Sequence, residues 1–284
     1  MRYTTLIATS DLAAHLTDPH WAMVDCRFDL TNTGWGEQAY HEAHIPGAVY
    51  AHLDRDLSGL KTGRNGRHPL PDVEGFKTRL GRWGISAGVQ VVAYDQNSGM
   101  WASRLWWMLR YLGHEAVAVL DGGLAKWVSE GWPTRAGDEQ RLPAQFVGLA
   151  REAMRVRVEE VERRRTDPAY RLIDSRAPER YRGEVEPLDP VAGHIPGAVH
   201  HYNLSNVNAD GTHLAPEELR ARFLALLGDV PATNVVTYCG SGVAAAHNVL
   251  AMEVAGLPGA RVYAGSWSEW CSDPARPVAR QTED

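Results

Sequence analysis

The feature that most constrains the fold of this chain is an internal repeat. The tetrapeptide at 24–27 (VDCR) recurs as IDSR at 173–176, and the hexapeptide HIPGAV at 44–49 recurs unchanged at 194–199. Two further matches, VVAY with VVTY and GGL with GSW, follow later in each half and keep the same order. The offset between copies is about 145 residues, much longer than the roughly 20 to 50 residues of a solenoid repeat. The pattern therefore indicates a duplicated domain.

Within each copy, short β-branched runs alternate with longer patterns typical of helices. Val91–Tyr94 and Val235–Tyr238 are the clearest strands, and each is followed by a glycine-containing turn. Helices are predicted after these turns, over Trp101–Leu112 and Val243–Ala255. This alternation predicts an α/β fold in which each copy is a parallel sheet flanked by helices. The predicted layout is an N-terminal domain at 1–135, a polar, proline-bearing linker at 136–153 and a C-terminal domain at 154–284.

Composition narrows the class of function. The 284 residues are 44% hydrophobic and 23% charged, which is typical of a globular protein with a proper core. The net charge of −6 gives no broad basic field, so neither nucleic acid nor a membrane surface is the expected partner, and a small molecule is. Three cysteines cannot all pair and have no zinc-binding spacing, so we expect a reducing compartment and no metal. No signal peptide or membrane helix is apparent, and the cytoplasm is the expected location.

The duplication supplies an internal control, because features shared by both copies are expected to serve the fold and features of one copy to serve chemistry. Asp25 with Arg27, and Asp174 with Arg176, are therefore interpreted as structural pairs at strand ends. His44 and His194 are interpreted as residues that fix the Pro-Gly turn in each copy. Of the other two cysteines, Cys26 is expected to be buried and Cys271 to be an exposed thiol near the C-terminus.

Cys239, by contrast, occurs in one copy only. It follows the second-copy strand, and Asp95 stands at the corresponding place in the first copy. A cysteine at a strand-to-helix turn, beside Gly240 and Gly242, faces backbone N–H groups and the positive end of a helix, both of which favour an anion. The thiolate is the nucleophilic form, and the same donors would stabilise a persulfide. The alternative is a small buried residue at a strand end, but the two glycines would then serve no evident purpose.

At this point the sequence resembles a known family. The run Cys239-Gly240-Ser241-Gly242-Val243, the repeated HIPGA, LDGG at 120–123 and YAGSWSEW at 263–270 together resemble the tandem-rhodanese sulfurtransferases across nearly the whole chain. In that family the N-terminal copy has lost its cysteine and the C-terminal copy is catalytic. The resemblance implies that Cys239 carries the sulfur and that Gly240, Gly242 and Val243 bind it and the substrate. It implies no cofactor.

The resemblance also bears on the sulfur donor. A Cys-Gly-Ser-Gly-Val loop is similar to that of 3-mercaptopyruvate sulfurtransferases, whereas thiosulfate-preferring rhodaneses carry Arg and Lys just after the cysteine. Arg180 matches the family's substrate-anchoring arginine, and the first copy has Thr31 at that place. The alternative for Arg180 is a solvated surface residue. Mercaptopyruvate enzymes often have a second arginine where this chain has Leu188, which keeps thiosulfate open as the donor.

The family further offers a Ser-His-Asp arrangement that spans the two domains. This sequence matches it with Ser241 in the loop, His68 in RHPLP and Asp54 in LDR. The first copy is about six residues longer than the second between HIPG and the strand, so a loop carrying His68 is long enough to reach the neighbouring site. The implied role is to orient Ser241 and to handle a proton while the donor's carbon leaves. The alternative is that His68 is an ordinary loop residue.

Together these predictions describe a sulfurtransferase with two half-reactions: Cys239 takes sulfur from a small anionic donor and passes it to a thiol, cyanide or a thioredoxin-like protein. A cysteine phosphatase is a rival, but it needs an arginine six residues after the cysteine, and that residue is Ala245. A non-enzymatic binding protein is the other rival. The retained cysteine argues against it.

Overall fold

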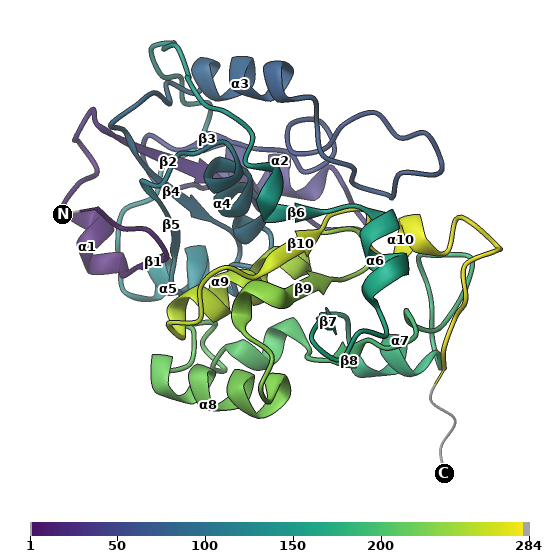
Figure 1. Ribbon diagram of the computed structural model, residues 1–284. Helices are drawn as coiled ribbons and strands as arrows, with labels where there is room; N and C mark the ends of the chain where they lie inside the picture. Colours follow the sequence, from purple (N-terminus) through teal and green to yellow (C-terminus); the bar gives the residue numbers. More distant parts are fainter. Residues whose placement is uncertain (1, 281–284) are drawn as a thin grey trace. The chain divides into compact units, whose positions relative to one another are not determined.

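The computed structural model describes residues 2–280, which form two compact units (Figure 1). Unit 1 comprises 2–59, 71–151 and 207–213; unit 2 comprises 60–70, 152–206 and 214–280. A short loop from each half of the sequence therefore belongs to the unit built from the other half. The loop at 60–70 is the one that carries His68.

Unit 1 contains one sheet of five parallel strands in the order β1-β5-β4-β2-β3. Its elements follow the chain as β1 (Leu6–Ile7), α1 (Thr9–Ala13), β2 (Trp21–Asp25), α2 (Trp35–Glu42), β3 (Val49–Tyr50), α3 (Val73–Arg82), β4 (Gln90–Tyr94), α4 (Ala102–Tyr111), β5 (Val117–Leu120) and α5 (Gly123–Ser129).

Unit 2 repeats this plan with a parallel sheet in the order β6-β10-β9-β7-β8. Its elements are β6 (Arg155–Val156), α6 (Val158–Arg164), β7 (Arg171–Asp174), α7 (Pro178–Arg182), β8 (Val199–His200), α8 (Pro216–Leu227), β9 (Val235–Tyr238), α9 (Ala244–Val254), β10 (Arg261–Tyr263) and α10 (Ser266–Trp270), with single 3-10 turns at Glu152–Met154, Asn203–Asn206 and Ala232–Asn234. The predicted α/β duplication is confirmed.

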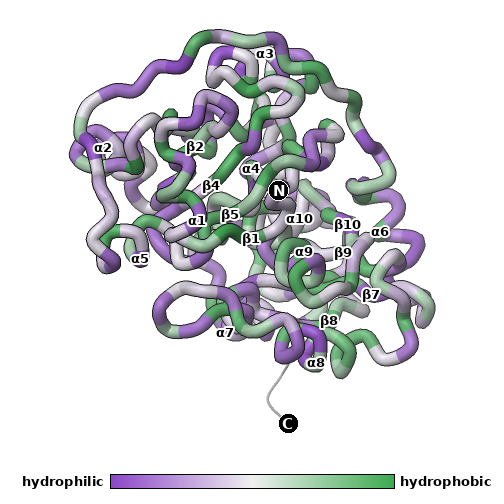
Figure 2. The backbone as a smooth tube through the Cα atoms, turned by 90° about the vertical axis from the view of Figure 1, so that its left-hand side faces the viewer, coloured by the Kyte–Doolittle hydropathy of each residue, from purple (hydrophilic) through white to green (hydrophobic). Residues whose placement is uncertain are grey.

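The central strands form because their residues are apolar on both faces. All five residues of β2 and of β4, and all four of β9, are buried, as expected for parallel strands covered by helices on either side. The tube through β4 is coloured as hydrophobic in Figure 2. The prediction was right for β9; β4 begins one residue earlier than predicted, and α4 and α9 are one residue shorter at each end.

The pairs shared by both copies hold equivalent positions in the two units. Arg27 contacts Asp25, and Arg176 contacts Asp174, each with Nη2 to Oδ2 at 2.7 Å. Burial alone would raise the pKa of Asp174, but the Arg176 ion pair outweighs it and the pKa is lowered. The predicted strand-end ion pairs are confirmed.

His44 and His194 also occupy matching places. The Nδ1 of each ring lies 2.7 Å from a backbone carbonyl oxygen, that of Tyr40 and of Tyr181 respectively, and each ring stacks on that tyrosine. Each histidine thus ties the start of the Pro-Gly turn to the preceding helix.

The expectation that Cys271 is an exposed thiol was wrong. Cys271 is buried in the core of unit 2, in the same apolar cluster as Trp267 and Trp270. Burial raises the pKa of its thiol to about 11. A cysteine in this state packs as a small apolar residue.

Candidate active site

The loop between β9 and α9 wraps its backbone around Cys239. The backbone N–H of Gly242 donates to the Cys239 Sγ atom at 3.1 Å, and the Cys239 N–H donates to the Ser266 hydroxyl at 3.1 Å. Gly242 has a φ of +79°, and a Cβ there would lie 2.4 Å from the carbonyl oxygen of Ala264. Only glycine is compatible with this turn, which is what aims its N–H at the sulfur.

The rest of the loop is anchored from behind. The N–H groups of Trp267 and Ser268, at the start of α10, donate to the carbonyl oxygens of Cys239 and Gly240 at 2.9 and 3.0 Å. Val243 is buried at the N-cap of α9, so the loop ends directly in a helix N-terminus. Cys239 itself is 4% exposed. The cysteine is therefore held in a fixed position, as a site for a bound anion requires.

Two guanidinium groups lie against the outer side of the loop. A Cβ built on Gly240 would lie 2.7 Å from Arg67 Nη2 and 3.5 Å from both terminal nitrogens of Arg180. The bare backbone of Gly240 thus allows the cations to approach the segment next to Cys239. Arg180 was predicted as a site residue; its side chain is partly buried beside the loop and is not a solvated surface residue.

Arg67 is the residue that the sequence analysis missed. It lies in the loop at 60–70, and its backbone N–H donates to the Ser268 hydroxyl at 3.0 Å. It is the first residue of the RHPLP motif, which was singled out for His68 alone, in the stretch by which the first copy is longer. That position is the only signal in the sequence that pointed to it.

Two buried carboxylates accompany the arginines. Glu186 accepts from Arg180 Nη2 at 2.6 Å and from Arg176 Nη1 at 3.2 Å. Asp189 contacts Arg67 and lies 3.5 Å from Arg180 Nη2. The chain thus fixes the orientation of both guanidinium groups by ion pairs with these two carboxylates.

The predicted serine and histidine are brought together. His68 Nδ1 lies 2.7 Å from the Ser241 Oγ atom, and both side chains are buried. This distance allows proton transfer between hydroxyl and imidazole. Asp54 belongs to unit 1, in the turn after β3, where its N–H donates to His52 Nδ1 at 3.1 Å. Its predicted role behind His68 stays a prediction.

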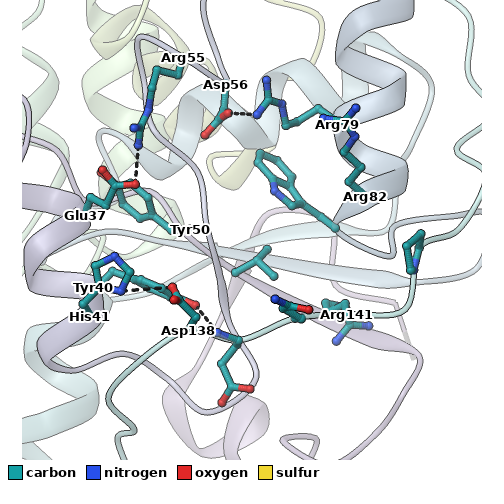
Figure 3. Close-up of a pocket in the computed structure, with 15 residues that line it drawn as sticks. Glu37, Tyr40, His41, Tyr50, Arg55, Asp56, Arg79, Arg82, Asp138 and Arg141 are labelled. Atoms are coloured by element: carbon teal, nitrogen blue, oxygen red, sulfur yellow. Dashed lines mark hydrogen bonds and ion pairs between the residues drawn. The ribbon is translucent and has the colours of Figure 1, made fainter.

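Unit 1 contains a cavity of about 710 Å³ between α2, α3 and the segment at 138–143, drawn in Figure 3. Its charged groups are mostly matched within the cavity: Arg55 donates to Glu37 at 2.7 Å and Arg79 pairs with Asp56. No cysteine, serine or lysine is among the described residues that line it. It therefore offers no thiol, and the Cys239 loop is the candidate active site.

Fold and loop together define a duplicated α/β protein with a cysteine in the strand-to-helix loop of its second copy. The chain belongs to the rhodanese family, since the profile of the rhodanese-like domain matches residues 8–130 and 157–273.

Similar proteins include a probable 3-mercaptopyruvate sulfurtransferase of Pseudomonas aeruginosa, 45% identical over 281 residues, which cover 98% of this chain and 99% of that one. A putative thiosulfate sulfurtransferase of Mycobacterium tuberculosis is 38% identical over 284 residues, 99% of both chains. The crystal structure of a 3-mercaptopyruvate sulfotransferase from Escherichia coli matches with a TM-score of 0.81 at 30% identity, over 93% of this chain and 99% of that one. Among the residues that the structure describes, no helix is long and apolar enough to cross a membrane.

Proposed function

We propose that this protein moves a sulfane sulfur from a small anionic donor to a thiol or cyanide through a persulfide on Cys239. The observation that carries the proposal is the Gly242 N–H on Cys239 Sγ, in a loop whose Gly240 faces two guanidinium groups. A nucleophilic sulfur and a site for a small anion are thereby adjacent. Full-length relatives named as sulfurtransferases support the same activity.

With 3-mercaptopyruvate, the Cys239 thiolate attacks the donor's thiol sulfur. A sulfur–sulfur bond forms, the carbon–sulfur bond breaks, and its electron pair passes to the pyruvate enolate. Ser241 and His68 provide the proton that converts the enolate to pyruvate, and the loop N–H groups hold the persulfide anion. In the second half-reaction a thiol, cyanide or thioredoxin-like acceptor attacks the outer sulfur and restores the thiolate.

The donor favoured is 3-mercaptopyruvate. The loop side chains at 240–243 carry no charge, and Arg180 with Arg67 presents two guanidinium groups for one carboxylate. Arg67 thus supplies a second cation in a chain that has Leu188 where mercaptopyruvate enzymes often have arginine. Thiosulfate remains the alternative donor, because paired guanidinium groups also suit a dianion and the relatives carry both names.

The test compares both donors on one preparation, with cyanide as acceptor and thiocyanate as the measured product. We expect a higher kcat/KM for 3-mercaptopyruvate. A clear preference for thiosulfate overturns the choice of donor but leaves the persulfide chemistry in place. Absence of turnover with either donor favours the other class of function, a rhodanese-fold binding protein. A cytoplasmic location remains a prediction from the sequence.

A further inference from the structure

Asp189 holds an unusual place for a carboxylate in a site that binds anions. Its side chain is 3% exposed and is shared by the two guanidinium groups that face the loop, Arg67 and Arg180. Glu186, equally buried, contacts Arg180 on the same side. A donor therefore enters a site that already contains two anions.

The charges of the buried ion-pair network cancel. Arg67, Arg176 and Arg180 are matched by three carboxylates, and Arg176 is already held by Asp174 at 2.7 Å. The site therefore attracts a donor through the orientation of its hydrogen-bond donors more than through an excess of positive charge.

Each of the two guanidinium groups contacts a buried carboxylate through some of its nitrogens and faces the loop with another. Arg67 contacts Asp189 through Nη1 and directs Nη2 at Gly240. Arg180 gives Nε and Nη2 to Glu186, and its Nη1 lies beside Gly240. In the part of the chain that the structure describes, no hydrogen bond is recorded for Arg67 Nη2 or Arg180 Nη1. Two N–H-bearing nitrogens thus converge on Gly240, the residue that follows Cys239.

We propose that Asp189 determines donor selectivity by acting as a built-in counter-anion that admits a monoanionic carboxylate and disfavours a dianion. The proposal rests on the sulfurtransferase function and concerns the same site. Its physical basis is that the repulsion between Asp189 and a bound anion scales with the charge of that anion. Asp189 therefore repels a dianion at Gly240 twice as strongly as a monoanion, and this repulsion offsets the equally doubled attraction of the dianion to the two guanidinium groups.

The consequence is a change in the ratio of two affinities. When Asp189 becomes neutral, a roughly tenfold gain in affinity for a monoanion corresponds to a roughly hundredfold gain for a dianion at the same place. The ratio of dianion affinity to monoanion affinity therefore rises about tenfold. A merely structural role for Asp189, in which it orients Arg67, predicts instead that both affinities fall together.

The experiment compares the wild type with Asp189→Asn. The matched control is Asp273→Asn, which removes the same charge from a half-exposed position in the same unit, paired with Arg276 at 3.9 Å. Titration calorimetry measures the Kd of pyruvate, a monoanion, and of sulfate, a dianion. Steady-state assays measure kcat/KM for 3-mercaptopyruvate and thiosulfate.

In Asp189→Asn we expect the ratio of sulfate to pyruvate affinity, and that of thiosulfate to mercaptopyruvate kcat/KM, to rise about tenfold. In Asp273→Asn both ratios stay at the wild-type value. Unchanged ratios in Asp189→Asn, or equal losses for both anions, overturn the proposal. The calorimetric comparison needs no turnover, so it decides the role of Asp189 even if the wild type proves inactive with both donors, a result that counts against the proposed function alone.

Discussion

The loops that follow the central strands of the two units surround different side chains with their backbone N–H groups. In unit 1, the carboxylate of Asp95 accepts backbone N–H bonds from Asn97, Gly99, Trp101 and Ala102, at 3.1, 2.9, 2.8 and 3.3 Å. In unit 2, the Cys239 Sγ atom accepts the N–H of Gly242 at 3.1 Å. Unit 1 thus fills its loop with an anion that is part of the chain. Unit 2 places there a thiol, which under the proposed function takes up the sulfur atom.

The loops at 60–70 and 207–213, each of which belongs to the unit built from the other half of the sequence, also differ between the two units. Each brings a histidine to the strand-end loop of the unit it joins. In unit 2, His68 contacts the Ser241 hydroxyl. In unit 1, the Cε1 atom of His213 lies 3.7 Å from the position that a Cβ on Gly99 would take. The Nδ1 atom of His213 contacts the Asp121 carboxylate at 3.0 Å. The same architecture therefore places a histidine against a serine hydroxyl in one unit and against a carboxylate in the other.

The largest effect, on the free energy of unfolding, is expected from removing the Asp95 carboxylate that the unit 1 loop surrounds. Asp95→Ala removes the acceptor of four N–H groups, and at about 1 kcal/mol for each we expect a loss of about 4 kcal/mol in the free energy of unfolding. Urea denaturation followed by circular dichroism measures it. The control Asp138→Ala changes an exposed carboxylate and should cost under about 0.5 kcal/mol. Equal stability of the two variants would refute the interpretation of Asp95 as an internal anion.

The two histidines give the next test. His68→Asn should lower kcat for 3-mercaptopyruvate about a hundredfold, because the imidazole that handles the proton is lost. His213→Asn, the matched change in unit 1, should leave kcat within about twofold of the wild type, since His213 belongs to unit 1 and has no assigned part in the reaction. Steady-state rates at saturating donor decide it. Comparable losses in both variants would mean that His68 acts on folding and not on the reaction.

A substitution at Leu188 tests whether the carboxylate of 3-mercaptopyruvate binds beside this residue. Its side chain is partly exposed next to Asp189, and Leu188→Arg should lower KM for 3-mercaptopyruvate about tenfold through one added charge-assisted hydrogen bond. Leu204→Arg, at a similarly exposed leucine of unit 2, is the control and should leave KM unchanged. If KM is the same in all three proteins, the donor's carboxylate does not bind beside residue 188.

The smallest effect concerns pH. Burial lowers the pKa of His194 and His201 in unit 2, as it does for His52 and His114 in unit 1. A folded-state pKa below the unfolded value of about 6.5 means that the unfolded chain takes up the proton first, so stability present above pH 6.5 is lost as the pH falls. His201→Gln should therefore reduce the loss of stability between pH 7.5 and 5.5 by about 1 kcal/mol, measured by urea denaturation at both values. A loss as large as that of the wild type would contradict this.

The sequence predicted the duplication, the parallel sheets and the position of Cys239, because short-range patterns and repeated motifs specify them. The resemblance to the tandem rhodaneses implied the contact of Ser241 with His68, and the extra length of the first copy was consistent with a loop of sufficient reach. The sequence did not reveal Arg67 or Asp189, whose importance arises only from the path of the loop at 60–70 across unit 2. It misjudged Cys271, because burial beside Trp270 depends on tertiary packing that no local pattern records.

The measurement that tests the central claim most directly is the intact mass of the protein after mixing with 3-mercaptopyruvate and removal of excess donor. The account predicts a gain of about 32 Da, reversed by cyanide and absent in Cys239→Ser, while Cys26 and Cys271 stay unmodified. The same gain in Cys239→Ser, or no gain in the wild type with either donor, would contradict the assignment of Cys239 as the sulfur carrier.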